Sequence, residues 1–427
     1  MNKDNIIEIN LERLHYLLRL FNLSEEEFIS MLNSGHKRAL NREEVFANKM
    51  PLALLKRIDK IFNKGIYYYI DFSPVSQGNH ASIFFRKQSF NGQLNLEARK
   101  MVDKFETLKN TLDTYNALAD VSFDRLLPSY TVKDNPRETA RAIRELLKMR
   151  SHKDEKEHLK FMINQLAKLN IYVFEYIETA NKKEKSNVEG FFIAPNVIVV
   201  KRQQGRLKRE LFTLAHELGH CVINVEEVEN VSDELSSGLS EIEKWCNDFA
   251  FYLLMGEEAV KLDGLKYANS KNDYAHDMIK EMSDATHISM LAIYTRLVIE
   301  KKMTQDDYSL VRGGIMANVR RAEEKRKLEV ADSNTVVSSP RPIISNLFRD
   351  TMQCALYRGV IDEATFCQQL NVKPERMEAK ICIVTEESRT GNDNKIFKKI
   401  PALCEFIGAR CITLVDFLST TSFHVEM

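Results

Sequence analysis

The chain has 427 residues, of which 44% are hydrophobic and 29% are charged. This balance excludes a wholly disordered chain, collagen and low-complexity sequence, and at about 100–200 residues per domain the length predicts two to four domains. Lysine and arginine total 61, as do aspartate and glutamate, so no global charge attracts the protein to nucleic acid or to an anionic membrane.

The N-terminus has no charged-then-apolar signal pattern, and no window approaches about 18 uninterrupted apolar residues. The seven cysteines include no CxxC pair. An odd number of cysteines without a signal peptide is typical of reduced thiols. We therefore expect a soluble, cytoplasmic protein without membrane association, disulfide bonds or a four-cysteine zinc site.

Residues 1–72 are predicted to form short helices. Apolar residues recur at helical spacing from Leu11 to Phe21, and residues 52–62 form a second amphipathic pattern. Ser24 with Glu27, and Asn41 with Glu44, are two capping boxes, each of which marks a helix start. Several short helices in succession predict a helix-turn-helix-like module.

The second half of this module is basic. Between His36 and Lys64 there are eight cations and three acids, a local charge of 8 − 3 = +5. The cations are Lys37, Arg38, Arg42, Lys49, Lys56, Arg57, Lys60 and Lys64. This segment could bind phosphate or could be a solvated helical face, and the sequence leaves both interpretations open.

A larger domain is predicted at 79–318, a linker at 319–342 and a small domain at 343–427. In the larger domain we expect a helix starting at Pro136, a helix at 161–169, a strand at 171–174, a strand pair at 190–193 and 197–200, and helices from 255 to 314. The linker combines a charged helix end with a Ser/Pro-rich segment. The small domain should contain helices near 343–358 and 362–371 and a strand at 381–384.

The segment Leu211–His220 contains the pattern HExxH. On a helix, His216 and His220 lie four residues apart, so both imidazoles project from one face and can share a metal ion, with Glu217 beside its open site. A chain of this length would contain the pattern by chance about once in a hundred cases. The alternative is a random match, in which the histidines are exposed or bonded to the backbone.

A third metal ligand is predicted on the acidic helix that follows. Glu243 lies 243 − 220 = 23 residues after His220, ahead of an apolar run, and Asn247 is one turn further on the same face, where it can hold a ligand histidine. Glu241 and Asp248 compete with Glu243 for this role. The remaining histidines considered, His158, His276 and His287, are expected to be core or surface residues.

These motifs resemble the ImmA/IrrE-type metallopeptidases. The resemblance rests on the strands at 190–200, on Phe212–His220 and on Glu243-x-x-Cys246-Asn247-x-Phe249-Ala250 followed by Leu253-Leu254-Met255, and it extends more weakly over 135–314. Cys246 replaces a usual alanine, and Gly256 a usual proline. The resemblance implies an α+β, mostly helical, zincin-like fold with a small sheet, flanked by helical domains.

The resemblance also implies a function: a zinc endopeptidase that cleaves a partner helix-turn-helix repressor and so derepresses mobile-element or stress genes. His216, His220 and Glu243 would bind Zn2+, and Glu217 would be the general base. Tyr252 and His287 are candidates for stabilising the oxyanion.

Two other functions stay open. The protein could bind DNA or a repressor without proteolysis, or it could belong to a toxin–antitoxin system. The second idea rests on residues 380–420, which are similar to the last third of a PIN-type nuclease. This segment offers Glu386, Glu387, Asp393 and Asp416 but no counterpart of the aspartate on the first strand, so we expect a remnant or a docking piece.

Overall fold

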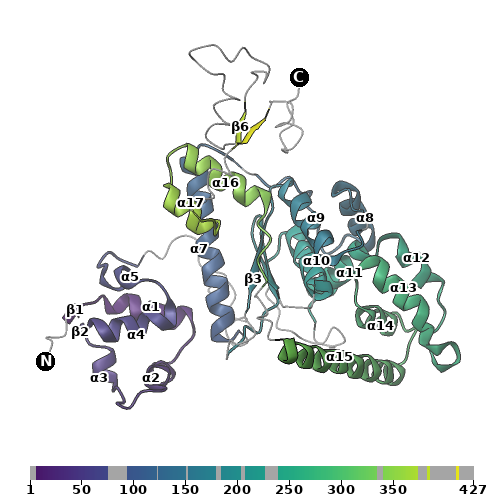
Figure 1. Ribbon diagram of the computed structural model, residues 1–427, viewed down its shortest axis with the longest axis horizontal. Coiled ribbons are helices and arrows are strands. Elements are labelled where there is room, and N and C mark those ends of the chain that lie inside the picture. Colours follow the sequence, from purple (N-terminus) through teal and green to yellow (C-terminus); the bar gives the residue numbers. More distant parts are fainter. Residues whose placement is uncertain are drawn as a thin grey trace, which may run out of the picture. The chain divides into compact units, whose positions relative to one another are not determined.

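The computed structural model describes residues 6–75, 94–122, 124–150, 152–178, 184–202, 207–226, 239–333, 340–373, 382–384 and 410–412. Helices predominate, and the strands form small sheets (Figure 1). The predicted fold class, α+β and mostly helical, is confirmed. No described helix combines the length and the apolar character that are needed to cross a membrane.

The N-terminal segment contains the predicted short helices and a small ribbon. The elements are β1 (Ile6–Glu8), α1 (Leu11–Leu20), α2 (Glu25–Asn33), α3 (Arg42–Val45), β2 (Lys49–Pro51), α4 (Leu52–Phe62) and α5 (Ile66–Ile70). Both predicted capping boxes are present, one at the start of α2 and one at the start of α3. The antiparallel β1–β2 ribbon was not predicted, because strands of three residues leave no alternating pattern to recognise.

A three-stranded sheet with the order β3-β5-β4 lies at the centre of the predicted peptidase domain. Its strands are β3 (Tyr172–Ile177), β4 (Gly190–Ile193) and β5 (Val197–Arg202), and β4 and β5 form the predicted antiparallel pair. Alternate residues of β4 face opposite sides. Phe191 contacts Phe105 of α7 (Leu96–Leu118), whereas Gly190 faces α10 (Leu207–Ile223), so the two helices cover opposite faces (Figure 1).

The remaining helices mostly follow the predictions. They are α8 (Pro136–Leu146), α9 (Glu155–Ala167), α11 (Glu241–Met255), α12 (Ala259–Gly264), α13 (His276–Thr286), α14 (Met290–Ile299) and α15 (Gln305–Ser333). The predicted linker at 319–342 differs, because α15 continues through its first part to Ser333. Residues 319–333 contain neither glycine nor proline and are rich in Ala, Glu, Lys and Arg, which favour helix.

The C-terminal region contains α16 (Asn346–Tyr357), α17 (Glu363–Gln369), β6 (Cys382–Val384) and β7 (Arg410–Ile412), and the two strands pair in parallel. Both predicted helices and the predicted strand are confirmed. The carboxylates of the PIN-like segment, Glu386, Glu387, Asp393 and Asp416, lie outside the described residues.

The chain divides by packing into two compact units. One comprises the described residues within 1–109, 129–143 and 175–341, and the other those within 110–128, 144–174 and 342–427. Inside the second unit, Tyr172 Oη lies 2.6 Å from Thr351 Oγ1, and the rings of Phe174 and Phe348 are 5.2 Å apart. This division differs from the predicted domains, because α9 and the start of β3 pack with α16.

Candidate metal centre

Helix α10 presents the HExxH residues. Its buried Leu211, Leu214 and Leu218 fix the helix in the core, and the four-residue spacing places both imidazoles on one side. The Nε2 atoms of His216 and His220 lie 3.2 Å apart. His220 is buried, and the His216 side chain is 12% exposed. The alternative of two exposed histidines is therefore excluded.

Helix α11 supplies the third group. Ser240 caps this helix by accepting a hydrogen bond of 3.1 Å from the backbone N–H of Glu243, which sets Glu243 in the first turn. The two carboxylate oxygens of Glu243 lie 3.1 Å from His216 Nε2 and 3.2 Å from His220 Nε2. Glu243 is only 3% exposed, so its charge must be balanced within the protein.

The close crossing of α10 and α11 depends on a glycine. A Cβ atom at Gly219 would lie 3.2 Å from the Cα and Sγ atoms of Cys246 and 3.2 Å from a ring carbon of Phe249. Any larger side chain would therefore push the two helices apart. Gly219 allows Glu243 of one helix to reach both histidines of the other.

The three side chains fit a zinc ion. Tetrahedral zinc with nitrogen and oxygen ligands at about 2.0–2.1 Å requires ligand atoms about 3.3 Å apart. The distances among His216 Nε2, His220 Nε2 and the nearest Glu243 oxygens are 3.1–3.2 Å. These three residues form a cluster of potential ligand atoms within 4.8 Å of one another. Two imidazoles and a carboxylate leave a fourth position for water or substrate.

The protonation states agree with this fit. Burial alone would raise the pKa of the Glu243 carboxyl, but hydrogen bonds with the imidazoles of His216 and His220 hold that pKa well below its ordinary value. Asn247 Oδ1 lies 2.9 Å from His216 Nδ1, and because a carbonyl oxygen accepts, the proton of the ring lies on Nδ1. The Nε2 atom of His216 then faces the cluster, and a bound metal ion would replace the proton that Nε2 donates to Glu243.

Glu217 follows His216 on α10 and is 5% exposed. Strand β4 approaches it very closely: a Cβ atom at Gly190 would lie 2.6 Å from Thr213 Cγ2 and 3.0 Å from both Cγ and Oε1 of Glu217. Gly190 therefore lets the edge strand lie against the HExxH glutamate. No local sequence pattern indicates this role for Gly190, because the role depends on the close approach of a strand to a helix.

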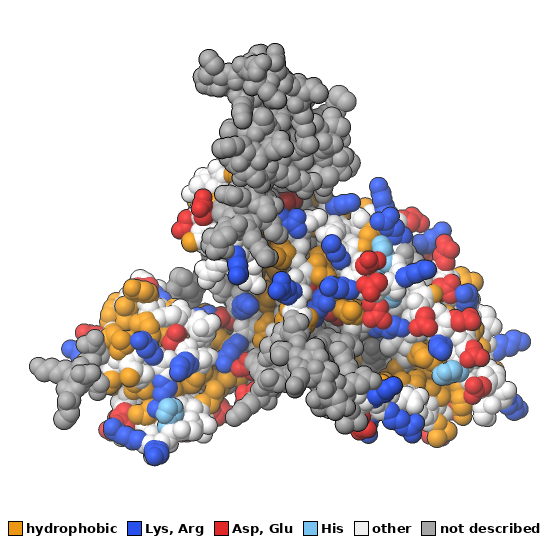
Figure 2. Space-filling view, viewed as in Figure 1, with side chains coloured by type: hydrophobic (Ala, Val, Ile, Leu, Met, Phe, Trp, Pro, Cys, Tyr) orange, Lys and Arg blue, Asp and Glu red, His pale blue; other side chains and the backbone are white. Residues whose placement is uncertain are grey.

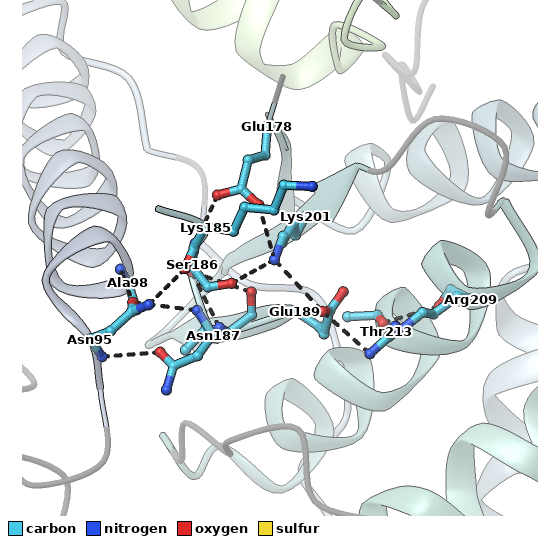
Figure 3. A network of polar contacts seen from close by, with 11 residues as sticks. Asn95, Ala98, Glu178, Lys185, Ser186, Asn187, Glu189, Lys201, Arg209 and Thr213 are labelled. Atoms are coloured by element: carbon cyan, nitrogen blue, oxygen red, sulfur yellow. Dashed lines mark hydrogen bonds and ion pairs between the residues drawn. The ribbon is translucent and has the colours of Figure 1, made fainter. Parts of the chain in front are cut away.

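A polar network fixes the approach of β4 to α10 (Figure 3). Lys201 Nζ, buried on β5, lies 3.2 Å from Glu178 and 3.7 Å from Glu189 and donates to the Ser186 carbonyl at 2.6 Å. Glu189, which immediately precedes Gly190, also pairs with Arg209 of α10 at 3.3 Å. The network ties the entrance of β4 to both β5 and the first turn of α10.

A second group of buried charges lies along the same helix. Arg202 of β5 pairs with Glu175 of β3 and lies 3.8 Å from Glu210 of α10. Burial, and then the neighbouring carboxylate of Glu175, raises the pKa of Glu210 to about 10. Glu210 is therefore protonated at neutral pH, while Glu175 and Arg202 form the ion pair.

The competing ligand candidates Glu241 and Asp248 do not belong to the cluster. Glu241 is exposed, and Asp248 pairs with Arg296. The Tyr252 hydroxyl accepts a hydrogen bond of 2.7 Å from the same arginine, and stabilisation of the oxyanion by Tyr252 or His287 stays a prediction. As expected for non-ligands, His158 and His287 are buried and His276 is exposed; His158 Nδ1 lies 3.3 Å from the Nδ1 atom of His152.

The two departures from the family pattern have structural consequences. Cys246 lies at the helix crossing, where a Cβ atom at Gly219 would come within 3.2 Å of it, and Gly256 has a φ of 55° where α11 ends. Proline cannot adopt that angle, because its ring holds φ near −65°. Cys221, Cys246 and Cys367 are buried free cysteines, and Cys354 is partly exposed.

Comparison with known families agrees with the site. Residues 166–297 match the family model Peptidase_M78, which is described as the IrrE N-terminal-like domain. The matched segment contains the HExxH helix, α11 and the β-sheet, and it supports both the resemblance to the ImmA/IrrE family and a metallopeptidase activity. The N-terminal module and the C-terminal region lie outside it. No curated protein and no solved structure matches the chain.

Proposed function

We propose that this protein is a zinc-dependent endopeptidase in which His216, His220 and Glu243 bind the metal ion. The observation that carries the proposal is the convergence of the three side chains at the distances that zinc requires. The three side chains come from two helices that pack closely at Gly219, so the fold itself brings them together.

Each residue of the site has a defined role in this proposal. A zinc ion, when bound, lowers the pKa of its water ligand and polarises the scissile carbonyl group. Glu217 accepts a proton from the attacking water and delivers it to the leaving amine. Asn247 holds the His216 ring in the tautomer that exposes Nε2, at an Oδ1–Nδ1 distance of 2.9 Å.

The proposed substrate is a partner transcriptional repressor of the helix-turn-helix type, whose cleavage would derepress mobile-element or stress genes. Support comes from the resemblance of the central motifs and from the family match over residues 166–297. We also propose that the protein is cytoplasmic.

The test is cleavage of a purified repressor encoded beside this gene. We expect the zinc-loaded protein to convert the repressor into two fragments. Glu217→Gln should retain zinc, because the three ligands are unchanged, and should lose about 10²–10⁴-fold in rate, the usual contribution of a general base. Cleavage by Glu217→Gln at the rate of the unaltered protein would contradict the proposal.

The alternative of a non-proteolytic DNA-binding regulator is less well supported. Four of the eight cations between His36 and Lys64 form ion pairs, namely Arg38 with Glu44, Arg42 with Glu25, Lys49 with Glu8 and Lys64 with Asp103. Helix α3 has only four residues. On the face drawn in Figure 2, basic and acidic side chains are intermixed. Full biological activity of Glu217→Gln would nevertheless favour a binding function.

The toxin–antitoxin alternative rests on carboxylates outside the described residues, and the structure adds nothing in its favour. Its test remains direct: the segment 340–427, incubated with RNA and Mg2+, should cleave the RNA if the alternative holds. We expect no cleavage, because several carboxylates from separate strands are needed to hold the metal ions.

A further inference from the structure

Strand β4 lies at one edge of the three-stranded sheet, because in the order β3-β5-β4 its only described neighbour is β5. Backbone hydrogen bonds with β5 hold one side of β4, so the distance between β4 and α10 depends on side-chain contacts. That distance matters for the proposed general base. The strand begins at Gly190, where a Cβ atom would lie 3.0 Å from Glu217 Oε1.

Glu189, the residue before β4, connects the sheet to α10 (Figure 3). Its Oε1 atom lies 3.7 Å from Lys201 Nζ of β5 and 3.3 Å from Nη2 of Arg209 on α10. Its backbone carbonyl also accepts a hydrogen bond of 2.6 Å from the backbone N–H of Lys201. A single residue at the start of the edge strand is therefore bound to both the neighbouring strand and the helix.

The two cations that Glu189 contacts differ in how firmly they are held. The Lys201 side chain is 4% exposed, and its Nζ atom lies 3.2 Å from Glu178 and donates to the Ser186 carbonyl at 2.6 Å. Arg209 is 39% exposed and pairs with no other carboxylate among the described residues. Loss of the Glu189–Arg209 pair would therefore free the helix from the strand, while Lys201 would keep Glu178.

Helix α10 transmits the position of this pair to the general base. Thr213 lies one turn from both Arg209 and Glu217, and its hydroxyl donates to the Arg209 carbonyl at 3.0 Å. Its Cγ2 atom lies 2.6 Å from the Cβ position at Gly190. Because the helix is continuous from Leu207 to Ile223, a strand that moves relative to Arg209 also moves relative to Glu217.

We propose that Glu189 and Arg209 are positioning residues of the peptidase, whose ion pair holds the β4 edge against Glu217. The inference rests on the proposed function and adds two residues to it, neither of which belongs to the metal cluster. A misplacement of about 1 Å in an active site can cost a hundredfold in rate, whereas a partly exposed ion pair contributes little to stability. Loss of the pair should therefore reduce turnover much more than folding stability.

Arg209→Gln and Glu189→Gln test the inference in the zinc-loaded, full-length protein, with cleavage of the repressor encoded beside this gene as the readout. We expect kcat to fall about tenfold in each variant, with KM and the zinc content unchanged. The double variant should be no slower than the single variants, because all three lack the same contact. Arg209→Lys, which can still pair with Glu189, should keep most of the activity.

Hydrogen exchange measures the position of the strand without a substrate. The amides of residues 190–193 should exchange severalfold faster in both single variants than in the unaltered chain. Asp263→Asn is the matched control, because it breaks the ion pair with Arg137, whose members are 38% and 45% exposed and lie outside the β4–α10 contact. It should change neither the exchange at 190–193 nor the rate of cleavage.

Three outcomes would overturn the inference while the metal centre stays intact. They are an unchanged kcat in both single variants, unchanged exchange at residues 190–193, and a higher KM at constant kcat, which would assign the pair to substrate binding. Absence of any cleavage by the zinc-loaded, unaltered chain would instead remove the proposed function and the inference with it.

Discussion

The side chain of Glu217 lies against a strand that can approach it only because residue 190 is glycine. In Gly190→Ala the new Cβ atom would lie 2.6 Å from Thr213 Cγ2 and 3.0 Å from Glu217 Oε1, so β4 or Glu217 must move. We predict a loss of about 1–3 kcal/mol in the free energy of unfolding and slower cleavage with zinc retained.

Two further variants test whether the contacts of the new Cβ atom cause the lower stability and the slower cleavage. Gly264→Ala is the matched control, because a Cβ atom there meets nothing within 4 Å. Adding Thr213→Ser to Gly190→Ala removes the closest contact and should restore part of the activity. Unchanged urea unfolding and unchanged cleavage in Gly190→Ala would show that the close approach does not matter.

The buried carboxyl group of Glu210 leads to a prediction about the pH dependence of stability. The pKa of Glu210 is raised to about 10 in the folded protein, above its ordinary value of 4.5 in an unfolded chain. Between these values the folded state holds a proton that the unfolded state releases, so stability is greatest at low pH and decreases as the pH rises towards 10. The slope from this group is at most about 1.4 kcal/mol per pH unit.

Glu210→Gln mimics the protonated form and cannot titrate. We expect its free energy of unfolding to fall less steeply between pH 6 and pH 9 than that of the unaltered chain. Both would be measured without metal, by urea unfolding followed by the fluorescence of Trp245, the single tryptophan. Parallel pH dependences would contradict a protonated Glu210.

At the scale of secondary structure, the metal site depends on how closely α10 and α11 cross. Gly219→Ala would place a Cβ atom 3.2 Å from the Cα and Sγ atoms of Cys246. We predict that α11 shifts and carries Glu243 away from the histidines, which weakens zinc binding about tenfold, as for other changes beside the ligands.

Chelator competition would measure this loss of zinc affinity. Adding Cys246→Ala removes the Sγ contact and should recover part of the affinity, whereas Cys246→Ala alone should bind zinc normally. If Gly219→Ala bound zinc as tightly as the unaltered chain, the crossing would not control the position of Glu243.

The helices of the metal site show which features could be predicted from the sequence and which could not. The i, i+4 period placed His216 with His220 and Glu243 with Asn247 on helix faces, and the structure brings these four residues together. Their chemical roles stay predictions. The role of Gly190 could not be predicted, because it arises from a contact between a strand and a helix.

The burial of charged side chains on β5 could not be predicted from the sequence either. Lys201 and Arg202 follow four apolar strand residues and have the appearance of a solvated strand end, yet they are 5% and 6% exposed. Only the arrangement of their acidic partners, which come from β3, the 178–189 region and α10, explains why they are buried. Such compensation has no local signal in the sequence.

At the scale of the whole molecule, the two compact units should differ in their dependence on α16. Phe348 is 6% exposed and stacks edge-on against Phe174 within the second unit. We predict that Phe348→Ala lowers the free energy of unfolding by about 3–5 kcal/mol while the protein keeps its zinc, because the ligands belong to the other unit. Tyr357→Ala, at a residue 62% exposed on the same helix, is the control for urea unfolding.

Loss of zinc in folded Phe348→Ala would show that the metal site depends on the packing of α16.

The packing of α16 against β3 also affects the design of fragments. A chain of 79–318, the domain predicted from the sequence, would lack α16 and leave Tyr172 and Phe174 without their partners Thr351 and Phe348. Substitutions in the full chain are therefore more informative than truncations at this boundary.

Zinc stoichiometry, measured by mass spectrometry of the purified full-length protein, shows whether Glu243 completes a zinc site with His216 and His220. We predict about one zinc ion per unaltered chain and a large loss of zinc in Glu243→Gln. The matched variant Glu241→Gln, on the same helical turn but exposed, should keep its zinc. Full zinc occupancy in Glu243→Gln, or zinc loss in Glu241→Gln alone, would show that Glu243 is not the third zinc ligand.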